Sequence, residues 1–90
     1  MYFVYILKSQ VNDKTYVGST SVNVDKRLAQ HNLGTNKWTK ANGPFKLVYY
    51  ESYTCKTDSL LREKFYKSGI GKQIKDIIIR NFNTAGVIHR

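Results

Sequence analysis

The sequence YFVYILK (residues 2–8), followed by KTYVG (residues 14–18), decides the fold of this chain. Both runs are rich in aromatic and β-branched residues, which favour strands, and residues 10–13 between them contain a turn-forming Asn-Asp pair. The two runs therefore predict a β-hairpin. If its loop holds an even number of residues, Tyr5 and Tyr16 lie on one face of the sheet, opposite or diagonal to each other.

The sequence next predicts a helix from about Val22 to Asn32. Four residues share one face of this helix, at i, i+3, i+4 and i+7: Val24, Arg27, Leu28 and His31. Such a face normally turns toward the core. An arginine on it has to meet an anion, because a buried and unpaired charge is very costly. The alternatives for Arg27 are an internal ion pair, a position at the rim of the core, or a functional site.

The rest of the chain predicts one strand and two helices. They are a strand at Phe45–Tyr53, a helix from Thr57 or Asp58 to Gly69, and a helix at about Lys72–Phe82. The last helix carries an apolar stripe made of Ile74, Ile77, Ile78 and Phe82. Residues 35–44 are polar and predict a surface loop.

The predicted order of elements is ββαβαα. This order predicts an α+β fold in which a three-stranded antiparallel sheet is flanked by helices. We expect one domain over residues 1–82. Residues 83–90 show no periodicity and predict a loosely packed C-terminal tail.

Composition points to a polyanionic partner. The chain of 90 residues has 15 Lys and Arg against 6 Asp and Glu, which gives a net charge of +9. Nucleic acid is the usual partner of such a small basic domain. An anionic membrane surface is the weaker alternative, because the basic residues are spread along the chain without an apolar anchor, and we expect no membrane partner.

The cysteine and targeting signals favour a reducing compartment. Cys55 is the single cysteine, so the chain forms no internal disulfide, and with two distant histidines it does not provide a structural zinc site. The sequence shows neither a signal peptide nor a long apolar stretch. We therefore expect a cytoplasmic location.

Five short motifs, in order, resemble the GIY-YIG nuclease superfamily. FVY and YVG, which include Tyr5 and Tyr16, are similar to the paired tripeptides that name the family. Three later motifs follow at family spacing: RxxxHN (27–32), GPFKLVYYE (43–51) and LREK (61–64). The match runs from about residue 2 to about residue 75 and resembles the small stand-alone GIY-YIG domain proteins. Two positions depart from the pattern, with Phe3 in place of glycine and Ser19 where many members have lysine.

The resemblance implies a fold with the first strand in the middle and a metal-dependent endonuclease activity on DNA. It implies that Tyr5 takes or relays the proton of the attacking water. It also implies that Tyr16 orients the phosphate or shares this task, and that His31 assists. Without the motifs, Tyr5 and Tyr16 would be interpreted as core residues, because strand tyrosines usually pack.

The residues themselves suit phosphodiester hydrolysis. Arg27 offers a planar, permanently charged fork for a nonbridging phosphate oxygen. Glu63 suits a single divalent cation, Mg²⁺ or Mn²⁺, completed by water and phosphate oxygens. Alternatively, Glu63 pairs with Lys67 at i+4 on a solvated helix face. Which of Tyr5 and His31 is the base stays open, because His31 titrates closer to neutrality whereas Tyr5 needs nearby positive charge.

Seven further residues are predicted to contact the nucleic acid. They are Lys37, Trp38 and Lys40 in the expected loop, and Lys64, Lys67, Lys72 and Lys75 on the last two helices. The indole would stack on an exposed base and the ammonium groups would meet the backbone. The alternative for the lysines is an ordinary solvated helix face.

Two other functions compete with the nuclease. A non-catalytic nucleic-acid-binding module is the first alternative, and a protein-interaction domain that kept the fold is the second. The chain is too small for a separate specificity domain, so selective cutting would need a protein partner, a homodimer or recognition of DNA shape. A role in DNA repair or recombination would suit such an activity, and the residues do not choose between DNA and RNA.

Overall fold

The strand β1 (Tyr2–Ser9) is the centre of the fold because both of its faces are buried. Side chains alternate along a strand, so neighbouring residues serve opposite faces. Val4 and Ile6 belong to one hydrophobic cluster, whereas Tyr5 and Leu7 belong to another. This double burial explains why residues 2–8 form an almost continuous apolar run.

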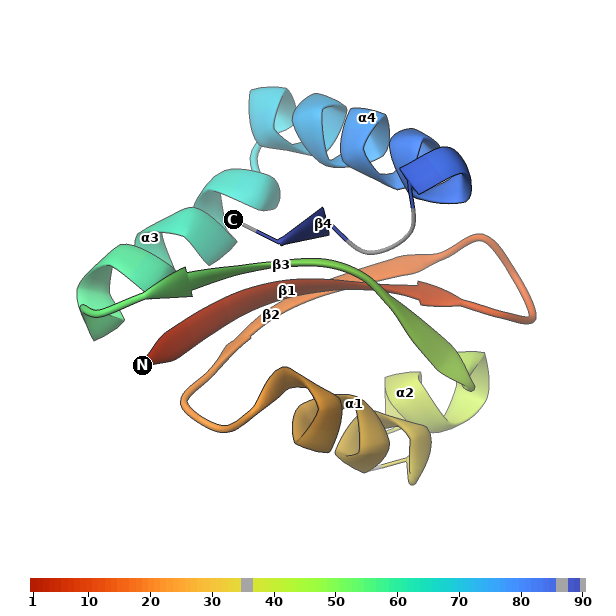
Figure 1. The fold of residues 1–90 in the computed structure, drawn as a ribbon. Coiled ribbons are helices and arrows are strands. Elements are labelled where there is room, and N and C mark those ends of the chain that lie inside the picture. The colour runs from red at the N-terminus through yellow and green to blue at the C-terminus, as the bar shows by residue number, and fades with distance from the viewer. Residues whose placement is uncertain (35–36, 86–87, 90) are drawn as a thin grey trace.

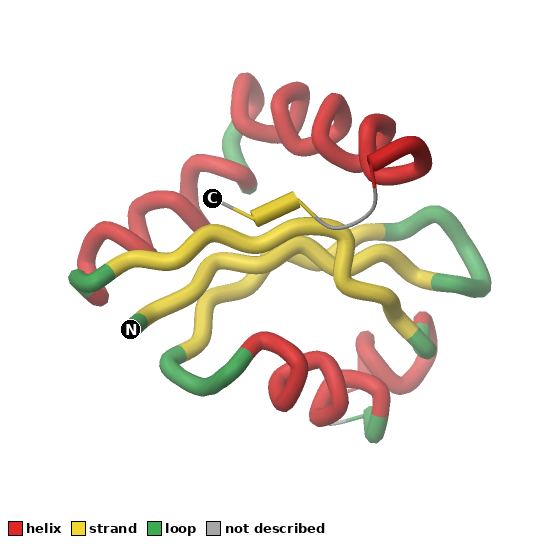
Figure 2. The backbone as a smooth tube through the Cα atoms, viewed as in Figure 1, coloured by secondary structure: helices red, strands yellow, loops and turns green. Residues whose placement is uncertain are grey.

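The computed structural model describes residues 1–34, 37–85 and 88–89. Strand β1 pairs in antiparallel fashion with β2 (Thr15–Thr20) and with β3 (Phe45–Tyr53). A short strand, β4 (Ile88–His89), pairs in parallel with β3, so the sheet order is β2-β1-β3-β4. Figure 2 shows this sheet as the middle layer of the molecule. The predicted three-stranded antiparallel sheet with β1 in the middle is confirmed, and β4 extends it.

Helices cover both faces of the sheet (Figure 1). The helices α1 (Val24–Asn32) and α2 (Lys37–Asn42) lie on one side, and α3 (Lys56–Tyr66) and α4 (Gly69–Ala85) lie on the other. Across the described residues, no helix combines the length and apolar character needed to cross a membrane.

Helix α2 corrects the prediction of a loop over residues 35–44, of which residues 35 and 36 lie outside the described residues. The helix lacks apolar periodicity because it buries polar groups, Thr39 and Asn42. Asn42 accepts a hydrogen bond from Asn12 Nδ2 at 2.9 Å, and its carbonyl accepts one from Ser9 Oγ. Tertiary hydrogen bonds to the β1–β2 hairpin therefore stabilise α2, and such bonds leave no hydrophobic pattern.

The apolar stripe predicted for the last helix is corrected at Ile74 and Ile77, and the side chain of Phe82 lies outside the described residues. Ile79 is the buried isoleucine of α4 and Ile78 packs against the core, whereas Ile74 is 36% and Ile77 49% exposed. Close contact with α3 sets this orientation, because a Cβ at Gly71 would lie only 1.7 Å from the Phe65 carbonyl oxygen. Position 71 therefore requires glycine.

The C-terminal part of the chain continues further than the predicted helix. Helix α4 ends at Ala85 instead of residue 82, and Ile88 and His89 pair with β3. Residues 86, 87 and 90 of the predicted tail lie outside the described residues. The division into a domain over 1–82 and a tail over 83–90 stays a prediction.

A buried carboxylate connects α3 to the sheet. Glu51 is only 3% exposed and accepts hydrogen bonds from Tyr49, Tyr53 and Tyr66. Arg62 Nε lies 3.0 Å from Glu51 Oε1 and completes the set. Burial raises the pKa of Glu51, but the four donors outweigh burial and hold this pKa below its usual value. The α3 residues that face the sheet are therefore polar or aromatic, and Leu60 and Leu61 stay exposed.

We expect Glu51→Ala to lower the free energy of unfolding by about 3 to 5 kcal/mol, because it leaves Arg62 and three phenols without their acceptor. Urea unfolding of the two proteins measures the change. Asp13→Ala is the matched control, since the Asp13 side chain is 97% exposed in its pair with Lys8. An equal effect of the two substitutions would contradict a structural role for Glu51.

Candidate active site

Three of the predicted site residues meet on the α1 side of the sheet. Tyr5 pairs with Gly18 in the β1–β2 register, so Tyr16 lies diagonal to Tyr5 on the same face, as predicted. Their ring centroids are 6.3 Å apart. His31 of α1 completes the group, with Nε2 at 2.8 Å from Tyr5 Oη and its ring centroid 4.7 Å from that of Tyr16. The expected helical face, which includes His31, is turned toward the sheet.

Gly18 makes room for the two phenols. A Cβ at this position would lie 2.5 Å from Tyr5 Oη and 2.9 Å from Tyr16 Cε1. Both distances are far inside van der Waals contact. The glycine of the YVG motif is therefore required by the close approach of Tyr5, and not only by the end of the strand.

Burial keeps Tyr5 and His31 neutral near pH 7. Burial raises the pKa of Tyr5 to about 12, nearby Tyr16 adds to the rise, and Arg27 opposes it. Burial also lowers the pKa of His31 to about 4, and the charge of Arg27 acts in the same direction. The simple expectation that His31 titrates near neutrality does not hold in this environment.

The hydrogen-bond partners of His31 indicate its tautomer. Within the described part of the chain, the buried Nδ1 atom has no partner, whereas Nε2 contacts Tyr5 Oη. A buried N–H without a partner is rarer than an acceptor without one. The tautomer with the proton on Nε2 avoids an unpartnered N–H at Nδ1; in it His31 Nε2–H donates to the Tyr5 oxygen, and the phenolic O–H then needs a different acceptor.

Arg27 lies one helical turn before His31 and is half-buried. Its Nη1 donates to Gln30 Oε1 at 2.8 Å. Among the residues that the structure describes, no carboxylate forms an ion pair with Arg27. Of the alternatives raised by the sequence, an internal ion pair is therefore not what the structure shows, and the guanidinium charge remains available to an anion.

Glu63 comes from α3 and lies at the edge strand β2. Its Oε1 atom accepts a hydrogen bond from Ser19 Oγ at 2.8 Å, and Lys67 Nζ lies 2.6 Å from Oε2. The i+4 pair with Lys67 is thus present, but the Glu63 side chain is only 22% exposed and does not belong to a fully solvated face. Its negative charge contributes to the raised pKa of Tyr5, so the two halves of the site influence each other.

The donor set around Glu63 fits one divalent cation better than two. In the described residues, no group of three or more His, Cys, Asp or Glu side chains gathers to hold a metal. Glu63 is a single carboxylate whose oxygens already attract an ammonium and a hydroxyl. Mg²⁺ is commonly bound by one or two carboxylates together with waters and substrate phosphates, so this arrangement fits it.

The predicted nucleic-acid contacts fall into two groups. Three of the lysines line a small cavity of about 190 Å³ beside β2, which we call the lysine pocket: Lys67, Lys72 and Lys75, together with Thr15 and Tyr16. Lys37, Lys40 and Lys64 are exposed on α2 and α3. Trp38 stacks on Phe45 with ring centroids 5.5 Å apart, and its ring is tilted by 37° against that of Tyr16 with centroids 5.6 Å apart, so the indole packs beside a site residue.

Sequence reasoning missed two participants. Ser19 holds Glu63 by a hydrogen bond across 44 positions, and Gln30 holds the Arg27 side chain. The sequence could have indicated Ser19, because it directly follows the YVG motif. It could not have indicated Gln30, since glutamine is common at exposed helix positions.

We expect Gly18→Ala to lower the free energy of unfolding by about 1 to 3 kcal/mol, because the added methyl group overlaps the Tyr5 hydroxyl. Thermal or urea unfolding measures the loss. Gly69→Ala is the matched control, because a Cβ there meets nothing within 4 Å. Equal stability of the two variants would show that Tyr5 does not need the space at Gly18.

Comparison with known proteins shows the family of this chain. A family model described as the GIY-YIG catalytic domain matches residues 1–75. A UPF0213 protein of Clostridium perfringens is 41% identical over 68 residues, which cover 74% of this chain and 71% of that protein. UPF0213 protein YsiG of Lactococcus lactis is 36% identical over 81 residues, or 89% and 76% of the two chains.

A solved structure of a similar protein has the same fold. The solution NMR structure of a UPF0213 protein from Bacillus halodurans is 26% identical, with a TM-score of 0.52, and the match covers 98% of this chain and all of that one. The resemblance noted in the sequence is thus confirmed. The chain belongs to the GIY-YIG catalytic domain family, and its relatives are small UPF0213 proteins.

Proposed function

We propose that this protein is a divalent-metal-dependent endonuclease that hydrolyses phosphodiester bonds in DNA. One observation carries the proposal: the buried Tyr5–His31 hydrogen bond lies beside an unneutralised Arg27 and within electrostatic reach of Glu63. A purely structural domain has no evident need for this combination. Membership of a catalytic domain family supports the same conclusion.

Arg27 and Tyr16 act on the phosphate. The guanidinium of Arg27 donates to a nonbridging oxygen and stabilises the negative charge that develops there. The Tyr16 hydroxyl orients the phosphate, while Trp38 packs against the Tyr16 ring and restricts its movement. Ser19 keeps the Glu63 carboxylate in place at the strand edge. A divalent cation held by Glu63 would supply positive charge for the phosphate and the leaving oxygen.

In its phenolate form Tyr5 takes the proton of the attacking water and becomes a neutral phenol. Before this transfer, His31 Nε2–H donates a hydrogen bond that stabilises the phenolate. The relative pKa values favour this order. Releasing the Tyr5 proton to solvent at pH 7 is unfavourable by the difference between a pKa of about 12 and the pH, which is about five units. Transferring it to His31 is unfavourable by the difference between the two pKa values, about 12 and about 4, which is about eight units. His31 is also fully buried, and it packs against both Tyr5 and Tyr16.

A non-catalytic nucleic-acid-binding module is the second candidate, because the net charge of +9 and the lysine pocket favour it. Such a module would bind DNA with a steep salt dependence and would not cut it with any divalent metal. A role in DNA repair or recombination, a cytoplasmic location, and a homodimer or protein partner for specificity stay predictions.

We expect Glu63→Gln and Arg27→Ala each to abolish Mg²⁺- or Mn²⁺-dependent cleavage of supercoiled, branched or single-stranded DNA, while the fold is kept. One substitution removes the anionic ligand and the other removes the phosphate clamp. Gel assays with each metal measure cutting, and circular dichroism checks the fold.

Two exposed residues on the same helices serve as controls for this experiment. Asp58→Asn on α3 and Lys26→Ala on α1 should retain cleavage. Cutting that survives in both Glu63→Gln and Arg27→Ala would overturn the nuclease proposal. Salt-sensitive binding without any cutting by the wild-type protein would favour the binding module.

We expect the cleavage rate to rise about tenfold per pH unit between about pH 6 and 9, because the phenolate fraction of Tyr5 grows in this way below a pKa of about 12. If His31 were the base, with a pKa of about 4, the rate would be constant over this range. Single-turnover rates at saturating metal measure the profile, and Tyr5→Phe should remove the dependence. A flat wild-type profile would exclude Tyr5 as the base.

A further inference from the structure

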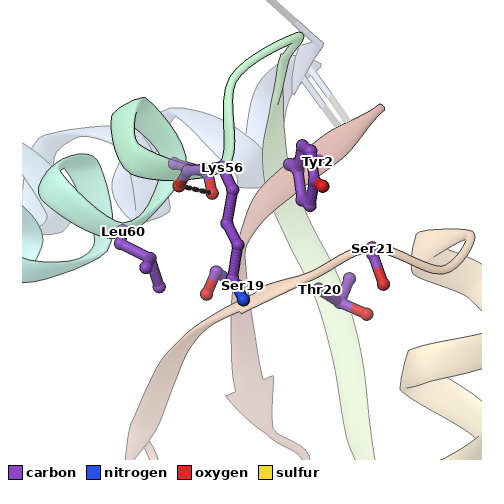
Figure 3. Close-up of a pocket in the computed structure, with 7 residues that line it drawn as sticks. Tyr2, Ser19, Thr20, Ser21, Lys56 and Leu60 are labelled. Carbon is purple, nitrogen blue, oxygen red and sulfur yellow. Dashed lines mark hydrogen bonds between the residues drawn. The ribbon is translucent and has the colours of Figure 1, made fainter.

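A pocket of about 410 Å³ lies next to the candidate site, where the end of β2 meets the beginning of α3 (Figure 3). Hydroxyl groups and one ammonium group dominate its lining: Tyr2, Ser19, Thr20, Ser21, Lys56 and Ser59. We call it the hydroxyl pocket. No residue of this lining belongs to the catalytic or lysine contacts predicted from the sequence.

Lys56 gives the hydroxyl pocket its positive charge. In Figure 3 its side chain extends from the first residue of α3 toward β2, and its nitrogen ends near Ser19 in this view. Throughout the part of the chain that the structure describes, no carboxylate pairs with this ammonium. The Lys56 ammonium is therefore available to bind an anionic ligand in this concave polar site.

The hydroxyls of β2 provide donors beside this charge. Thr20 Oγ1 accepts a hydrogen bond from the backbone N–H of Val22 at 3.1 Å, which leaves the O–H of Thr20 free to donate. Ser21 is exposed at the same end of the strand. Hydroxyl and ammonium donors are the groups that usually contact the phosphate oxygens of nucleic acids.

The hydroxyl pocket is joined to the metal ligand. Ser19 lines the pocket and donates to Glu63. On the helix, Lys56 and Glu63 are seven residues apart, which corresponds to about 10.5 Å along the axis of α3. This separation equals the rise of about three nucleotides of one DNA strand. Lys67, which contacts Glu63 from the other side, belongs to the lysine pocket.

We propose that the hydroxyl pocket binds a backbone phosphate of the DNA substrate, about three nucleotides from the phosphate that reacts. The strand then follows β2 from the lysine pocket, past Glu63, to Lys56. The inference rests on the proposed function and adds the course of the substrate and a second phosphate site. The Glu63 carboxylate repels an unshielded phosphate, so the ligand lies on the Lys56 side of Ser19.

The test is DNA binding by the full chain in the presence of a metal chelator, so that no cleavage is needed. Fluorescence anisotropy of labelled DNA is measured over a salt series for the wild type, Lys56→Gln and Lys56→Arg. Lys14→Gln is the matched control, because it removes the same charge from an exposed position in the β1–β2 loop. Ser21→Asp adds a negative charge to the hydroxyl pocket without touching Lys56.

We expect Lys56→Gln to weaken binding and to reduce the salt slope by about 0.9, the loss of one phosphate contact, whereas Lys56→Arg should keep both. Ser21→Asp should weaken binding in the same direction, and Lys14→Gln should leave the slope unchanged. Equal slopes for Lys56→Gln and Lys14→Gln would overturn the proposal even if the protein cuts DNA. A Lys56-dependent slope in a protein that never cuts would instead retain the phosphate site and reject the nuclease.

Discussion

The hydrogen bond between Tyr5 and His31 ties helix α1 to the central strand, and the candidate site depends on it. It requires three features at once: a strand buried on both faces, a glycine at position 18 in the neighbouring strand, and a helix whose buried face carries His31 in addition to Val24. The cost is an unsatisfied buried nitrogen on His31. Proteins retain such costs mainly where function requires them, which is why this contact is more informative than the family motifs alone.

Glu51 and Glu63 show how the surroundings of a carboxylate decide whether it can bind a ligand. Glu51 is saturated by three phenols and the guanidinium of Arg62, so it has no remaining capacity for a ligand. Among the described residues, Glu63 has only one hydroxyl and one half-exposed ammonium as partners. Lysine is strongly hydrated and flexible, so the divalent cation of the proposed mechanism would displace Lys67 at a moderate cost. Burial and saturation therefore assign the two glutamates different roles.

Much of the fold followed from the sequence because strand signals were strong and local. Strand β3 was predicted with its observed bounds, Phe45–Tyr53, and the parity of the hairpin placed the site tyrosines on one face. What failed depended on tertiary partners. Helix α2 buries polar groups, Glu51 is buried among hydrogen-bond donors from α3 and β3, and the orientation of α4 depends on a backbone contact at Gly71. The spacing of apolar residues along the sequence does not reveal hydrogen bonds and contacts between distant residues. The motifs in the sequence were enough to name the site residues. Their protonation states could not be predicted in this way, because they depend on how deeply each residue is buried in the fold.

The contact between Trp38 and Tyr16 has a practical consequence for spectroscopy. Trp38 is the single tryptophan of the chain, so all of its indole emission originates next to a residue of the candidate site. Trp38 is 37% exposed as a residue, so its emission wavelength follows the local polarity. The protein thus contains an intrinsic optical probe whose signal reports on the surroundings of Tyr16 without any label.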